Sequence, residues 1–145
     1  MSQASIYPPT RYEPSPLIDL ASKNERARLS PAAVRTFFKI MARWRIRDED
    51  ARLLLGGMSN GPFYQTKKNP ERVLDTDRLT RISYLIGIFK ALNILYSDKL
   101  ADNWVQLPNK NRIFNGQPPL AYMVKGGIPA MQTVRRLLDA RRGGM

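Results

Sequence analysis

Residues 54–68, LLGGMSNGPFYQTKK, combine glycines, amides, hydroxyls, two aromatic rings and two lysines, and three kinds of structure use such a combination. A phosphate-binding loop requires the spacing G-x-x-x-x-G-K-[ST] after a strand, whereas Gly57 and Gly61 are four residues apart and Pro62 follows. A β-hairpin requires flanking segments that alternate apolar and polar residues, and the flanks here do not alternate. Two short helices joined by a glycine-containing turn, a helix-turn-helix, fit the pattern.

In a helix-turn-helix, the second helix enters the major groove of DNA, and here that helix would begin near Ser59 or Asn60. Amides can pair with adenine edges, hydroxyls and lysines bind phosphate, and aromatic rings contact thymine methyl groups. We expect Phe63 to be buried, and the pattern leaves Tyr64 open between the core and the surface. The candidate DNA-binding residues are Ser59, Asn60, Tyr64, Gln65, Lys67 and Lys68.

The composition removes most kinds of enzymatic chemistry. The chain has no histidine and no cysteine, which excludes disulfides, thiol nucleophiles, ordinary zinc sites and histidine acid/base catalysis. Its acidic residues mostly stand where helices are expected to begin, and carboxylates there complement the positive end of the helix dipole. We therefore predict that the chain is not an enzyme and that it uses no metal and no cofactor.

The positive charge indicates an acidic partner. The net charge is +12, and nucleic acid is the first partner that such a charge suggests. The excess falls in two blocks: residues 29–70 carry eight Lys or Arg against three acids, and residues 101–145 carry seven against two. Two basic blocks suggest two surfaces with different roles, although a general contribution to solubility is the simpler alternative.

The sequence favours a cytoplasmic protein. No apolar run approaches the roughly 18 residues that cross a bilayer. The start, MSQASIYPPTRYEPSP, lacks the basic cluster and the apolar stretch of a secretory signal.

Apolar spacing and capping residues predict an all-α fold. A Pro-rich arm over residues 1–28 precedes a first helix, with Ser30 as its N-cap and Pro31 in its first turn, that ends near Arg45. Leu53, Leu54 and Leu55 are expected to anchor the next, short helix. The longest segment with a helical period predicts a helix over residues 76–96. A short helix follows, then a loop, a helical turn that stops at Gly126 and Gly127, and a last helix from Pro129.

Two segments carry a resemblance to a known family. The first is ARWRIRDEDARLLLGGMSNGPFYQTK, residues 42–67, and the second is ADNWVQLPNKNRIFNGQPPLAYMVKGGIPAMQTVRRLLDARRGG, residues 101–144. Both resemble the Xre-type antitoxins of bacterial RES-Xre toxin-antitoxin systems, the Xre/MbcA/ParS family. The chain departs from that family at NGPFYQT, residues 60–66, where relatives usually carry a more basic stretch with a tryptophan.

The resemblance implies a function for each part of the chain. It implies an antitoxin that neutralises a RES-domain toxin, an enzyme that degrades NAD, by occluding the toxin's active site with its C-terminal end. It also implies a homodimer that binds operator DNA in its own promoter and represses transcription. The domains would be the arm 1–28, a helix-turn-helix domain 29–96 and a toxin-binding domain 97–145. Within the last, the residues implied are Arg135, Arg141, Arg142, Gly143, Gly144, Trp104, Phe114, Tyr122 and Met123.

Other interpretations stay open on the residues alone. The apolar members of the toxin-binding set could be the core of their own domain, and the arginines could complement a helix C-terminus. The whole chain could be a DNA-binding transcriptional regulator without a toxin partner. A basic RNA-binding protein would share the charge, but it usually shows exposed aromatic residues on a sheet or a loop-rich basic tail.

Overall fold

The computed structural model describes residues 19–143, and the regular elements in that range are all helical, which confirms the predicted all-α class. The α-helices are α1 (Lys23–Arg43), α2 (Asp48–Leu54), α3 (Asn60–Lys68), α4 (Thr76–Leu95), α5 (Asp98–Asn103) and α6 (Pro119–Arg142). Two short 3-10 helices, η1 (Trp104–Gln106) and η2 (Arg112–Phe114), precede α6. None of the described helices is both long and apolar enough to cross a membrane.

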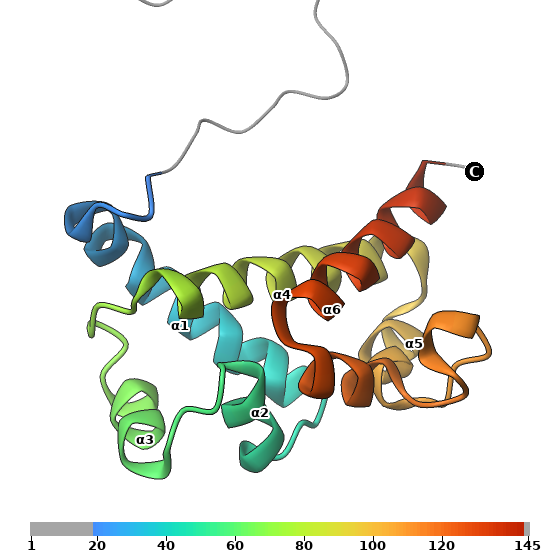
Figure 1. Ribbon diagram of the computed structural model, residues 1–145, viewed down its shortest axis with the longest axis horizontal. Helices are drawn as coiled ribbons and strands as arrows, with labels where there is room; N and C mark the ends of the chain where they lie inside the picture. Colours follow the sequence, from blue (N-terminus) through green and yellow to red (C-terminus); the bar gives the residue numbers. More distant parts are fainter. Residues whose placement is uncertain (1–18, 144–145) are drawn as a thin grey trace, which may run out of the picture.

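Helix α4 is the central element of the fold. It packs against α1 and against α6, while α3 contacts α1 and α2 contacts α6 (Figure 1). Helix α4 buries more than one face, because Gly87 and Ala91 are buried outside the stripe of apolar side chains that recur at steps of three and four. Those that are fully or almost fully buried are Leu79, Ile82, Leu85, Ile88 and Leu92. The helices that precede α4 and those that follow it therefore share one hydrophobic core.

The first helix starts earlier than the sequence suggested. Ser22 is the N-cap, and its hydroxyl accepts a hydrogen bond of 3.3 Å from the Glu25 amide, so α1 begins at Lys23. The spacing Ser-x-x-Glu is the signature of a capping box, and it outweighs Pro31, which lies inside the helix. The predictions of a start at Ser30 and of an arm that reaches residue 28 are therefore wrong. Residues 1–18 of that arm lie outside the described residues.

Ser30 has a different role from the one predicted. Its side chain is buried, its hydroxyl donates to the Arg26 carbonyl at 2.6 Å, and it accepts from the Leu74 amide at 3.0 Å. The segment between α3 and α4 is thereby fixed to α1. A buried hydroxyl in this position satisfies a backbone N–H that would otherwise have no partner.

Two short helices joined by a turn lie around the glycines, as the pattern predicted: α2, the turn and α3. Gly56 and Gly57 both have a φ of 86°, a left-handed conformation that glycine adopts without strain. Leu54, Leu55 and Met58 are buried beneath the turn. Leu53 is 43% exposed, so the expectation that it anchors α2 is wrong: the inner face of this short helix carries Ala51 and Leu54.

Helix α6 consists of two segments, as the glycine pair predicted. Gly127 has φ 66° and ψ −145°, a conformation that breaks the helical path. Pro129 follows at the start of the second segment, where its missing N–H costs no hydrogen bond. The bend lets the first segment pack near α5 and η1 while the second runs along α4 (Figure 1).

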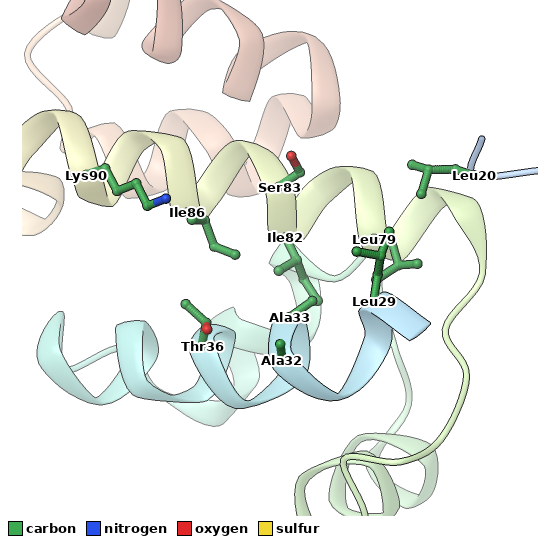
Figure 2. A pocket seen from close by; sticks show the side chains of 10 residues that line it. All are labelled: Leu20, Leu29, Ala32, Ala33, Thr36, Leu79, Ile82, Ser83, Ile86 and Lys90. Atoms are coloured by element: carbon green, nitrogen blue, oxygen red, sulfur yellow. The ribbon is translucent and has the colours of Figure 1, made fainter. Parts of the chain in front are cut away.

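An open groove of about 530 Å³ lies between α1 and α4 (Figure 2). Leu29 and Ala33 of α1 face Leu79, Ile82 and Ile86 of α4 across it (Figure 2). Small side chains on α1 leave the space between the two helices unfilled.

We predict that Ser30→Ala destabilises the fold by about 1–3 kcal/mol, because it leaves the Leu74 amide without its hydrogen-bond partner. The measurement is urea unfolding followed by circular dichroism. The control is Ser83→Ala on α4, where the serine is exposed, and it should change stability by less than about 0.5 kcal/mol. Equal effects of the two changes would show that the Ser30 hydroxyl is not a structural link.

Candidate functional site

Helix α3 divides into a buried and an exposed face. Phe63 and Thr66 are buried, and the Phe63 ring packs edge-on against Phe38 of α1 with centroids 5.4 Å apart. The expected burial of Phe63 is confirmed, and Tyr64 proves to be exposed. The six candidate DNA-binding residues are all exposed: Ser59, Asn60, Tyr64, Gln65, Lys67 and Lys68. The helix thus presents amide, hydroxyl and ammonium groups to solvent on one side.

A carboxylate of α2 contacts this exposed face. The Tyr64 hydroxyl donates to Asp48 Oδ2 at 2.7 Å, and Lys67 Nζ lies 3.9 Å from Asp48 Oδ1. The hydrogen bond to the Asp48 carboxylate, together with its negative charge, raises the pKa of Tyr64. Lys67 also lies over the Phe38 ring, with Nζ 5.6 Å from the centroid. Two of the candidate DNA-binding residues, Tyr64 and Lys67, therefore already contact Asp48.

The other acids of α2 turn away from α3. Arg47, just before the helix, forms ion pairs with Glu49 at 3.9 Å and with Asp50 at 3.3 Å. All three acids stand in the first turn of α2, where they complement the helix dipole. Asp48 is the acid of this turn that contacts α3.

Aromatic side chains build the core of the C-terminal part. Trp104, Phe114 and Tyr122 stack edge-to-face in a row, with centroid distances of 6.0 Å and 5.3 Å. Trp104 and Phe114 are buried, Met123 is completely buried, and Tyr122 is half-buried. These side chains can support a binding surface from beneath, and among the four Tyr122 has the most access to solvent.

The loop between η1 and α6 is shaped by asparagines. The side chain of Asn109 accepts from the Asn111 amide at 2.9 Å, and that of Asn111 accepts from the Ile113 amide at 3.1 Å. Asn115 adopts a left-handed conformation with φ 49°, which asparagine tolerates better than most residues. Side-chain hydrogen bonds therefore take the place of regular secondary structure in the segment PNKN, residues 108–111, which leads into η2.

The end of α6 carries arginines that are held by specific partners. Asp139 accepts from Arg135 Nε at 3.0 Å and lies 3.7 Å from Arg142 Nη1, so the two arginines share one carboxylate. Arg141 Nη1 donates to the hydroxyl of Tyr96, at the end of α4, at 2.9 Å. The candidate residue Gly143 is exposed just after the helix. Gly144 lies outside the described residues.

Arg135 rests on a glycine of the neighbouring helix. Its guanidinium lies against Gly87 of α4, and a Cβ at position 87 would overlap Nη1 and lie 2.5 Å from Cζ. The absence of a side chain at Gly87 lets the guanidinium lie flat between α4 and α6. Arg135 is therefore positioned by the backbone of α4 at Gly87, against which it packs, and by Asp139, to which it donates a hydrogen bond.

Sequence reasoning missed three residues that organise these surfaces. Asp48 was considered only as a helix-start acid, and Tyr96 was not singled out. Asp139 stands four residues after Arg135, a spacing that signals an ion pair on a helix, and this signal could have been found. Asp48 and Tyr96 act across 16 and 45 residues, so no local spacing could have revealed them.

The chain matches a protein family over its C-terminal part. Residues 91–144 match the antitoxin Xre/MbcA/ParS C-terminal toxin-binding domain. The chain belongs to the Xre/MbcA/ParS antitoxin family. The uncharacterized protein y4oB of Sinorhizobium fredii (strain NBRC 101917 / NGR234) is 37% identical to this antitoxin over 115 residues, which are 79% of this chain and 87% of the relative. No solved structure matches the chain significantly.

The family match gives the C-terminal part a partner. The matched domain binds a toxin, so the described end of α6, with Arg135, Arg141 and Arg142, belongs to a toxin-binding domain of an antitoxin. The match begins at Ala91, inside α4, so the last turn of the central helix is part of the matched segment together with Tyr96. A regulatory role by protein binding follows from the family.

We predict that Gly87→Ala displaces the Arg135 guanidinium without unfolding the protein, because the atoms it meets are at the far end of a flexible side chain. NMR of the arginine Nε–H groups measures the displacement directly. Gly61→Ala is the control, since a Cβ there meets nothing within 4 Å. Each change removes a helical glycine and gains up to about 1 kcal/mol in helix propensity, and Gly87→Ala should gain less. An unmoved Arg135 signal would contradict the assigned contact.

Proposed function

We propose that this antitoxin neutralises a RES-domain toxin that degrades NAD, by placing the C-terminal end of α6 over the toxin's active site. We propose further that it binds its own promoter as a homodimer through α2 and α3 and represses transcription. The match of residues 91–144 to a toxin-binding domain is the observation that carries the first proposal. The exposed polar face of α3 in a helix-turn-helix supports the second.

The arginines at the end of α6 suit an occluding role. A guanidinium offers five N–H donors in a planar fork, so it can pair with the carboxylates and carbonyls of a nucleotide-binding pocket. Arg142 is exposed and shares Asp139 with Arg135, while Arg141 is tied to Tyr96. Gly143 adds little bulk beyond the last turn, which lies at the edge of the molecule (Figure 1).

The buried candidate residues of the C-terminal part would act indirectly. Trp104, Phe114 and Met123 are buried, so we assign them to support of the docking surface, and Tyr122 to its edge. Truncation of one of the buried side chains would create a cavity and destabilise the domain. Loss of toxin binding in such variants would therefore report folding rather than contact.

Deletion of residues 141–145 should abolish inhibition of the toxin, because it removes both terminal arginines and the chain beyond them. The measurement is NAD consumption by the purified RES-domain toxin with increasing antitoxin. The double variant Arg141→Ala/Arg142→Ala tests the guanidinium groups alone and should raise the inhibitory concentration at least tenfold. Arg28→Ala, an exposed change in α1, should inhibit as the wild type does. Full inhibition by a folded, truncated chain would refute occlusion.

The DNA proposal rests on the groups that α3 presents. Lys67 and Lys68 would contact phosphates, while Asn60 and Gln65 would read base edges. Two recognition helices of a homodimer would meet successive half-sites roughly 34 Å apart. Helix α4 and the C-terminal part are the proposed dimer surfaces.

Substitution of Lys68 by Ala should weaken duplex binding for every sequence and reduce the salt slope, d log K/d log[salt], by about 0.9. Fluorescence anisotropy with a promoter duplex and a scrambled duplex, titrated with salt, measures both quantities. Gln65→Ala should instead reduce the preference for the promoter. Lys99→Ala, an exposed change on α5, is the control for net charge. Equal slopes for Lys68→Ala and Lys99→Ala would place the DNA elsewhere.

A further inference from the structure

The contact between α2 and α3 has the chemistry of a phosphate site. A phosphate oxygen bound by a protein commonly accepts from a hydroxyl and pairs with an ammonium group. At α3 the Tyr64 hydroxyl and Lys67 Nζ converge on the two carboxylate oxygens of Asp48, at 2.7 Å and 3.9 Å. These two groups therefore bind a carboxylate of the same chain, that of Asp48, in place of a phosphate.

The geometry of the site leaves it open to solvent. The side chains of Lys67 and Asp48 are 48% and 46% exposed, and Tyr64 is 45% exposed. An anion from outside can therefore reach both donors once Asp48 does not hold them. Lys67 would stay in place, because it also lies over the Phe38 ring.

Asp48 is distinguished from its neighbour by its partner. Glu49 stands in the same turn of α2 and is exposed, but it pairs with Arg47 rather than with α3. Removing the charge of either residue changes the net charge by the same amount and removes one acid from the helix N-terminus. The ion pair with Lys67 and the charged acceptor of the Tyr64 hydroxyl are lost in only one of the two cases.

We propose that Asp48 is an internal competitor for DNA phosphate, which occupies the Tyr64–Lys67 pair and limits the affinity of α3 for duplex DNA. The inference rests on the proposed DNA binding and adds a residue that lowers it. Binding of DNA requires the phosphate to displace the carboxylate or to approach beside it against like-charge repulsion. The carboxylate also makes binding more selective for the DNA sequence. Because it weakens one phosphate contact, the contacts of α3 with base edges must supply a larger share of the affinity.

The test compares Asp48→Asn with Glu49→Gln in the full chain, by anisotropy with the promoter duplex and a scrambled duplex over a range of salt. Asp48→Asn should tighten binding to both duplexes by up to about fivefold relative to Glu49→Gln, since an exposed ion pair contributes at most this much. It should also steepen the salt slope by up to about 0.9, because no carboxylate then competes with phosphate for Lys67. Glu49→Gln should show only the smaller effect of net charge.

Two further measurements keep the result interpretable. Thermal unfolding of the two variants should agree closely, because each loses one first-turn carboxylate. The pKa of Tyr64, followed by NMR of the ring carbons, should fall in Asp48→Asn and stay unchanged in Glu49→Gln, because the carboxylate that raises it is gone.

Each outcome decides something. Equal binding by the two variants, with binding by the wild type intact, overturns the role of Asp48 and leaves the proposed DNA binding standing. Weaker binding by Asp48→Asn than by Glu49→Gln overturns it as well, since Asp48 would then hold Tyr64 in a productive position. Binding by Asp48→Asn alone supports the inference in its strongest form. Absence of binding in all three proteins at low salt refutes both the DNA proposal and the competitor.

Discussion

The fold depends on the burial of one helix on two sides. Helix α4 packs against α1 and against α6, so the N-terminal helices and the toxin-binding part are built on a common support. Its apolar residues at steps of three and four contribute to the cores of both parts. Gly87 shows how closely α4 and α6 approach, because a side chain there would overlap Arg135. A change in the middle of α4 would disturb both candidate surfaces together, whereas a change on one surface would disturb that surface alone.

Much of the fold could be predicted because its signals are local. Apolar spacing gave α4, the glycine pair gave the bend of α6, and the pattern of residues 54–68 gave α2, the turn and α3. The start of α1 was missed because Ser30 and Pro31 were interpreted as its beginning, whereas Ser22 and Glu25 form the cap. The contacts that position the candidate sites were not predictable, because they join residues far apart in the sequence. They are the hydrogen bonds between Ser30 and Leu74, Asp48 and Tyr64, and Tyr96 and Arg141.

The two candidate surfaces use arginine and lysine differently. At the end of α6, Arg135 and Arg142 share Asp139, so their charge is partly compensated within the helix. On α3, the charge of Lys67 is partly compensated by the Asp48 carboxylate of α2, whereas Lys68 forms no ion pair among the described residues. Formal charge along the sequence therefore overstates what each surface offers a partner. The resemblance to the antitoxin family identified the toxin-binding end more securely than charge did, because the family match rests on residue order.

The hydrogen bond between Arg141 and Tyr96 has a consequence for the thermodynamics of complex formation. It ties the last turn of α6 to the end of α4, and Leu138 one turn earlier is fully buried. A helix end that already has its shape before it meets a protein loses less conformational entropy on association than a chain that must fold there. Preorganisation of this kind favours a long-lived complex with the protein partner that the C-terminal domain binds.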